Sequence, residues 1–150
     1  MIDNLIKYLK DVCFNFDINQ NRKELHKGLI QEISKRLFNK DFEITLEYPL
    51  IFNSLIIRDQ RKMIKQGYID LFAKNKSNTI AIEFDSGQHL KYKSIEKLLQ
   101  CNSNKVIGIV RGKEGIDCER DNINRIKDEL NSSEKEFWLI ILYNKKCIKI

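Results

Sequence analysis

The segment IAIEFDSG, residues 80–87, constrains the fold more than any other stretch, because it places two carboxylates in an apolar strand. Its apolar residues suit a buried strand, but Glu83 and Asp85 interrupt them just before a Ser-Gly turn. Burying an ionised carboxylate costs on the order of several kcal/mol unless a partner compensates the charge, and two neighbouring carboxylates repel each other. The folded chain must therefore bring a compensating group to these acids.

A third acid is expected to join this pair through a β-hairpin. Asp70 is embedded in the apolar run YIDLFAK, residues 68–74, and NKSN at 75–78 has the composition of a hairpin turn. Such a hairpin sets Asp70 opposite Glu83, and side-chain alternation puts Glu83 and Asp85 on the same face of their strand. Three carboxylates at neighbouring strand ends predict an oxygen-rich pocket that suits a hard divalent cation such as Mg²⁺ or Mn²⁺.

Hydrophobic periodicity predicts the other elements. Helical spacing is found at 2–9, 22–38, 89–101 and 121–131, and strand-like runs are found at 42–48, 79–84, 105–110 and 137–143. The wholly apolar run KVIGIV is expected to be a central parallel strand, and Pro49 is expected to end the first strand. Between Pro49 and Gly67, SLII is open to interpretation as a further strand, and RDQRKMIK as a basic loop or a hairpin arm. The element order indicates an α/β protein with a mixed sheet flanked by helices.

Length and composition bound the class of protein. A chain of 150 residues suits a single domain, residues 1–150, that buries its core without disulfide or metal staples. The four cysteines are widely spaced and form no CxxC pair, so we expect reduced, mostly buried thiols rather than a zinc site or a disulfide framework. No segment is apolar enough to span a bilayer or to act as a signal peptide, and we therefore expect a cytoplasmic protein without a membrane partner.

The charge balance favours a polyanionic partner. Lysine and arginine number 27 against 21 acids, and the formal net charge of +6 is a modest excess. The distribution is more informative, because basic residues gather before Asp70 and after Asp85. The candidate phosphate contacts are Arg58, Arg61, Lys62, Lys65, Lys91, Lys93 and Lys97, with Gln100 and Arg111 further along the chain. Each of them can instead be a solvated surface residue.

The acids and the element order together resemble the PD-(D/E)XK nuclease superfamily, which has the restriction-endonuclease-like fold with an α-β-β-β-α-β core. The resemblance covers about residues 22–112, with additions at both ends. Asp70 corresponds to the Asp of the motif, with Ile69 in place of proline, and Glu83 corresponds to its (D/E). Asp85 stands where the motif has lysine. Some members of the superfamily carry an acid there, and in others the lysine has moved to the following helix.

The resemblance implies a metal-dependent nuclease that hydrolyses phosphodiester bonds, with DNA as the expected substrate, as an endonuclease or an exonuclease. Asp70, Glu83 and Asp85 would ligate Mg²⁺ or Mn²⁺, with Asp85 serving either as a ligand or as the base that orients the water. Lys93, which shares a polar helix face with Lys97, would stabilise the phosphate. The other basic residues would contact the nucleic acid, and a homodimer is compatible with this interpretation.

Two other classes remain open at the level of sequence. One is a nuclease-fold module whose missing motif lysine marks lost hydrolysis, and which binds nucleic acid or a protein partner. The other is a regulatory protein that needs no metal. Glu24 and Glu32 are interpreted as solvated helix acids, although family analogy would make one of them an additional metal ligand. His89 is interpreted as a cap of its helix rather than a proton-transfer group.

Overall fold

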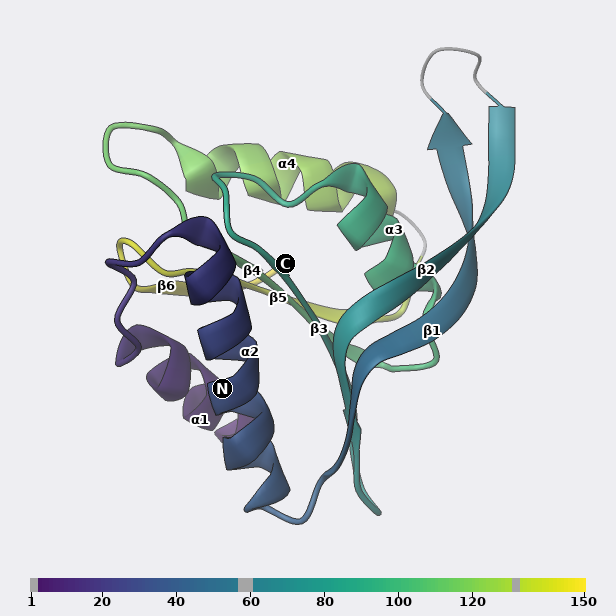
Figure 1. Ribbon diagram of the computed structural model, residues 1–150. Helices are drawn as coiled ribbons and strands as arrows, with labels where there is room; N and C mark the ends of the chain where they lie inside the picture. Colours follow the sequence, from purple (N-terminus) through teal and green to yellow (C-terminus); the bar gives the residue numbers. More distant parts are fainter. Residues whose placement is uncertain (1–2, 57–60, 131–132) are drawn as a thin grey trace.

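The computed structural model describes residues 3–56, 61–130 and 133–150, which form four helices and six strands (Figure 1). The helices are α1 (Asn4–Phe14), α2 (Arg22–Phe38), α3 (Tyr92–Gln100) and α4 (Cys118–Leu130). The strands are β1 (Glu43–Ile56), β2 (Arg61–Lys74), β3 (Thr79–Asp85), β4 (Lys105–Val110), β5 (Glu136–Ile141) and β6 (Lys146–Lys149). These strands make one sheet in which the spatial order follows the sequence.

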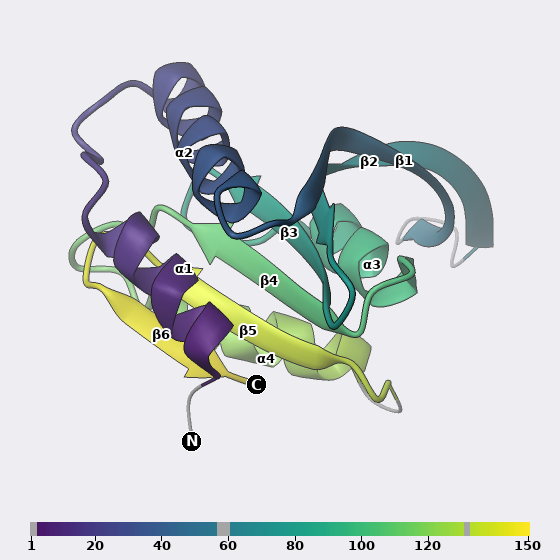
Figure 2. The ribbon, with the colours of Figure 1, turned by 90° about the horizontal axis from the view of Figure 1, so that it is seen from below.

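The sheet is parallel in its centre and antiparallel at its sides. β3, β4 and β5 are parallel neighbours, whereas β1, β2 and β6 pair in antiparallel fashion. α1 and α2 pack on one face, and α3 and α4 pack on the other (Figures 1 and 2). This arrangement confirms the predicted mixed α/β architecture, and it confirms that KVIGIV is a central parallel strand.

Two apolar clusters hold the layers together, one on each face of the sheet. Leu25, Leu29 and Ile33 recur along α2 at helical spacing and are fully buried on the first face. Ile95 and Leu98 of α3 are fully buried on the second. Burial of a leucine or isoleucine side chain contributes about 1.5–3 kcal/mol, so these stripes determine how the helices lie on the strands.

The first strand is longer than the sequence predicts, because Pro49 does not end it. β1 runs from Glu43 to Ile56, and Pro49 pairs with Tyr68 of β2. A proline cannot donate a hydrogen bond, but β1 is an edge strand with no neighbour in the sheet on its other side, within the part of the chain that the structure describes. The prediction that Pro49 ends the strand is therefore wrong, and Ser54, Leu55 and Ile56 of the SLII segment are the last residues of β1.

The distal parts of β1 and β2, residues 50–56 and 61–67, form a two-stranded arm that projects beyond the rest of the sheet (Figure 1). This agrees with the hairpin-arm interpretation of the basic segment. The Gln100 amide exchanges two hydrogen bonds with the Asn53 backbone, at 2.7 and 2.8 Å. Ser54 donates a hydrogen bond of 3.0 Å to Glu96. α3 therefore braces the arm.

Other boundaries also differ from the prediction, and the strand expected at 137–143 ends at Ile141. α1 continues to Phe14 because Cys13 extends its buried stripe, α3 begins only at Tyr92, and α4 begins earlier, at Cys118. The sequence pattern does not predict β6, whose four residues include no fully buried side chain and depend on pairing with β5.

Composition predicts reduced, mostly buried thiols and no membrane-spanning segment. All four cysteines are free, with three of them buried and Cys147 half-buried, as expected. Among the described residues, no helix has the length and apolar character that crossing a membrane requires.

Candidate active site

Asp70 and Glu83 meet where the pairing between β2 and β3 ends. The last paired residues are Leu71 and Ile82, and beyond them the acidic side chains replace backbone contacts between the strands. The Asp70 amide donates to Glu83 Oε2 at 3.1 Å, and the Phe84 amide donates to Asp70 Oδ2 at 2.8 Å. Each carboxylate is thus anchored by the neighbouring strand, and the structure brings the two acids together as the hairpin spacing predicts.

Lys97 of α3 compensates the charge of Glu83. The glutamate is 2% exposed, and its Oε1 atom accepts no hydrogen bond from the described residues, but the Lys97 ammonium group lies against this oxygen as an ion pair. Lys97 Nζ also donates a hydrogen bond of 2.7 Å to the Tyr68 carbonyl oxygen, which holds the ammonium group beside β2. Lys97 therefore supplies a cation of the kind that the buried acid requires.

His26 of α2 contacts Asp70 and is not singled out by the motif. Its Nε2 atom lies 3.2 Å from Asp70 Oδ2, and its ring stacks on Phe84 with the centroids 5.4 Å apart. The hydrogen bond with Asp70 raises the pKa of the imidazole, although burial opposes this shift. One signal for His26 exists in the sequence: it lies one turn before Ile30 on the apolar stripe of α2, where a polar side chain is unexpected.

The two glutamates considered on the same helix do not reach the site. Glu24 is exposed near the start of α2, as expected for a solvated acid. Glu32 forms an ion pair of 2.8 Å with Arg36 and is not among the residues that line the cavity at Asp70. α2 therefore contributes an imidazole to the acidic pair, rather than a further carboxylate.

Burial and mutual repulsion push the pKa values of the two acids apart. Burial raises the pKa of Glu83 to about 8, and the charge of Asp70 adds to this effect, while Lys97 opposes it. Burial would also raise the pKa of Asp70, but hydrogen bonds from His26 and from β3 lower it below the ordinary value. In the metal-free protein, Glu83 therefore binds a proton more readily than Asp70 does.

The raised pKa of Glu83 predicts how the stability of the metal-free protein depends on pH. The pKa of Glu83 is about 8 in the folded protein against an ordinary value of 4.5, so the folded state binds the proton more strongly than the unfolded chain. The resulting contribution to the free energy of unfolding is complete below about pH 4.5 and is lost as the pH rises towards about 8. Urea denaturation in EDTA should show this loss, and Glu83→Gln should remove it. Parallel pH profiles of the two proteins would contradict the assignment.

Asp85 lines the same cavity and also has a structural role. Its Oδ2 atom accepts the amide hydrogen of Lys91 at 2.9 Å, one residue before α3 begins. This bond ties the end of β3 to the start of α3 and occupies one of the two carboxylate oxygens. Asp85 joins Asp70 and Glu83 in the cavity wall, as the strand alternation predicts.

A buried asparagine of α4 holds the loop between β3 and α3. Asn122 is fully buried, and its Oδ1 atom accepts the amide hydrogen of Leu90 at 2.7 Å. Its Nδ2 atom donates to the carbonyl oxygens of Gln88, at 3.1 Å, and Cys118, at 2.7 Å. The side chain therefore satisfies three backbone groups, and it positions the loop that leads from Asp85 into α3.

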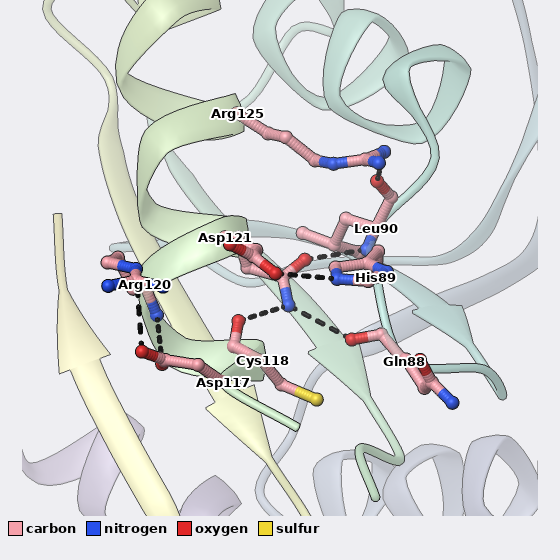
Figure 3. Close-up of polar contacts among 9 residues, drawn as sticks. Gln88, His89, Leu90, Asp117, Cys118, Arg120, Asp121 and Arg125 are labelled. Carbon is pink, nitrogen blue, oxygen red and sulfur yellow. Dashed lines mark hydrogen bonds and ion pairs between the residues drawn. The ribbon is translucent and has the colours of Figure 1, made fainter. Parts of the chain in front are cut away.

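His89 belongs to this loop and does not cap its helix. The N-cap position of α3 is Lys91, and no side chain makes a capping hydrogen bond there among the described residues. The His89 ring instead lies 3.3 Å from Asp121 Oδ2 of α4, as Figure 3 shows, and it lines the cavity with the acids. The capping interpretation is therefore wrong, because the helix begins three residues after His89.

The acids and both histidines line one cavity of about 400 Å³, whose rim is cationic. Arg22, Lys91 and Lys93 are exposed residues of its wall. None of these three side chains forms an ion pair with a described residue. Cations without an acidic partner beside a cavity favour the binding of an anion. The site thus combines a buried acidic pair with a positively charged rim.

The other predicted nucleic-acid contacts lie in different places. Arg61, Lys62 and Lys65 belong to the β2 strand of the arm, and Arg58 lies outside the described residues. The amide of Gln100 is used within the protein to brace the arm, as described above. Arg111 follows β4 and lines a second cavity that adjoins the first.

The acids supply oxygen donors of the kind that Mg²⁺ prefers, but they do not form a ready-made cage. Within residues 3–56, 61–130 and 133–150, no group of three or more His, Cys, Asp and Glu side chains is arranged to hold a metal ion. Mg²⁺ is often bound by one or two carboxylates, with water and substrate phosphates completing its octahedron. Asp70 and Glu83 fit a two-carboxylate site of this kind, whereas the predicted group that includes Asp85 is not preformed.

Comparisons with known proteins place the chain in no family, since no family model and no curated protein matches it. The chemistry of the cavity is therefore the basis for assigning a function.

Proposed function

We propose that this protein is a metal-dependent nuclease that hydrolyses phosphodiester bonds of DNA. The observation that carries the proposal is the buried pair of Asp70 and Glu83, in contact with Lys97, inside a cavity whose rim cations form no ion pair with a described residue. Two adjacent buried carboxylates weaken a fold, so a role in binding and chemistry is the better explanation for them. The helix and strand order along the mixed sheet supports the finer proposal of a restriction-endonuclease-like fold.

The acidic pair and Lys97 would act on the scissile phosphate. Asp70 and Glu83 would hold Mg²⁺ or Mn²⁺, which when bound lowers the pKa of a water molecule and neutralises charge on the phosphate. The Lys97 ammonium group, already placed beside Glu83, would donate hydrogen bonds to a phosphate oxygen as negative charge develops there. His26 would keep Asp70 oriented through its hydrogen bond.

Asp85 and the rim cations would act on the water and on the remaining phosphates. One oxygen of Asp85 is bound to the Lys91 amide, and the other would accept a proton from the attacking water. Arg22, Lys91 and Lys93 would neutralise phosphates on either side of the scissile bond.

Mg²⁺ or Mn²⁺ is expected to raise the melting temperature, because a ligand that binds only the native state stabilises it by mass action. At 100 times the dissociation constant, the gain in the free energy of unfolding is about 2.7 kcal/mol. Asp70→Asn should lose most of this gain, whereas the matched variant Asp128→Asn, which changes an exposed acid on α4, should keep it. Calorimetry that detects no binding of millimolar metal to the folded protein would remove the metal from the proposal.

The activity itself is tested by incubating the protein with Mn²⁺ and labelled linear, circular and single-stranded DNA, with RNA in parallel. Cleavage that EDTA abolishes is the expected result. Cleavage of the circle indicates an endonuclease, and cleavage of the linear forms alone indicates an exonuclease. A protein that binds metal but cleaves none of these substrates would contradict the proposed function.

A nuclease-fold module without catalysis is the second candidate, and one observation favours it. Lys97 already compensates Glu83, and the described residues contain no preformed three-ligand group, so the acidic pair is compatible with a folded protein that holds no metal. This candidate predicts nucleic-acid binding that is insensitive to Mg²⁺, together with no cleavage.

A further inference from the structure

A second cavity, of about 450 Å³, adjoins the candidate active site. It is built by the loops that follow β3, β4 and β5, together with Arg22 at the start of α2 and Ile18 shortly before it. It shares Arg22, Ser86 and Gly87 with the first cavity. Loops beyond the carboxyl ends of parallel strands are a frequent location of ligand sites in α/β proteins. A nucleic-acid strand with one phosphate at the acidic pair can therefore continue into this neighbouring cavity.

The second cavity is positively charged. Arg22, Arg111 and Lys113 line it, and none of these side chains forms an ion pair or a hydrogen bond with another residue in the described part of the chain. Glu114 is the one acid among the described lining residues. Three cations and a single acid among the described lining residues favour the binding of an anion. Arginine is well suited to the geometry of a phosphate group.

The wall of this cavity is held in place by backbone contacts. The Gly112 amide donates to the Gly87 carbonyl at 3.1 Å, and the Tyr143 amide donates to the Arg111 carbonyl at 2.9 Å. Gly112 has a φ of 77°, and a Cβ atom there would lie 2.5 Å from Cδ1 of Tyr143. The half-buried Tyr143 ring therefore packs directly on the glycine and forms part of the wall. A fixed aromatic ring beside cations suits a nucleotide, whose base can stack while its phosphate is neutralised.

We propose that the second cavity is a flanking subsite, which binds the nucleotide next to the scissile phosphate. Arg111 and Lys113 contact the phosphate of this nucleotide, and its base stacks on Tyr143. The inference rests on the proposed nuclease function, because it extends the same substrate beyond the acidic pair. It also defines the substrate class as a single strand or an unpaired strand end, since a base must leave its duplex to stack inside a protein cavity.

The subsite is tested by binding rather than by cleavage. The probe is a thymidine trinucleotide with a 5′-phosphate, titrated into the full chain in EDTA so that no bond is hydrolysed. We expect the double variant Arg111→Gln, Lys113→Gln to weaken binding at least about tenfold, because two charge-assisted contacts are lost. The slope of log affinity against log salt should become shallower by about 0.7 to 1.4.

The matched control removes the same charge far from the subsite. Lys74→Gln, Lys76→Gln changes two exposed lysines at the turn between β2 and β3, which is the opposite end of β3 from the cavity, and should alter affinity by less than about twofold. Tyr143→Leu should weaken binding at least about fivefold, and Tyr143→Phe should retain it, because the ring and not the hydroxyl stacks on the base.

The outcomes separate the subsite from the proposed activity. Absence of trinucleotide binding, or equal losses in the two double variants, would overturn the flanking subsite while leaving metal-dependent cleavage to be judged by its own assay. A subsite that behaves as expected in a protein that cleaves nothing would instead overturn the nuclease function and keep the nucleotide site. Equal binding by Tyr143→Leu and wild type would remove the base contact and with it the single-strand assignment.

Discussion

Replacing Lys97 with methionine is expected to lower the rate of phosphodiester hydrolysis at least about 100-fold. Lys97 is the cation in contact with Glu83, and its side chain is largely buried, so its charge is poorly screened by water. Removal of one positioned donor to developing negative charge typically costs a factor of about 10²–10³ in rate. Single-turnover cleavage and DNA affinity should be measured together, since the loss is expected in the rate.

The control for Lys97→Met is Lys93→Met, which removes the same charge from the same helix. Lys93 is exposed and forms no ion pair with a described residue, so we expect a loss of no more than about fivefold, mainly in affinity.

Lys97→Met also breaks a buried ion pair, which costs roughly 3–5 kcal/mol, and thermal unfolding must accompany the assay. Lys97→Arg, which keeps the charge, should recover the stability and only part of the rate. A larger loss of cleavage rate in Lys93→Met than in Lys97→Met would contradict the role of Lys97. It would support the prediction from the sequence that Lys93 stabilises the phosphate.

Asp85→Asn is expected to abolish most of the cleavage while the fold survives. Asparagine can still accept the Lys91 amide hydrogen through its side-chain oxygen, so the start of α3 stays in place. It cannot accept a proton from water, and it removes a negative charge beside the acidic pair. We expect a loss of at least about 100-fold with little change in melting temperature, comparable with that of Asp70→Asn, because groups that act as a unit are not additive.

Asp85→Lys distinguishes an active site from one that has lost its lysine. In an active site, this change places a cation beside the acids and removes the hydrogen bond to the Lys91 amide, so cleavage should fall further. In a degenerate site, the same change would restore the motif lysine and raise cleavage from a low level. An increase would therefore contradict the assignment of Asp85 and favour the module without catalysis.

Local features of this protein follow from the sequence alone. The turn at 75–78 closes the hairpin, as its composition predicts, and Asn21 caps α2 by accepting the Glu24 amide hydrogen at 2.8 Å. Both depend on side chains only a few residues apart, which short-range periodicity and turn composition specify. The encounter of Asp70 with Glu83 belongs to the same class, because a tight turn sets the register of the strands that it joins.

Only the tertiary structure decided which distant groups meet the acids. Lys93 and Lys97 share a polar helix face, and the way in which α3 packs on β2 brings Lys97 against Glu83. His26 reaches Asp70 only because α2 packs on the face of the sheet that holds Phe84. Pro49 is tolerated because β1 lies at the edge of the sheet. Each outcome depends on helix packing and strand order across the molecule, which the periodicity of one segment does not encode.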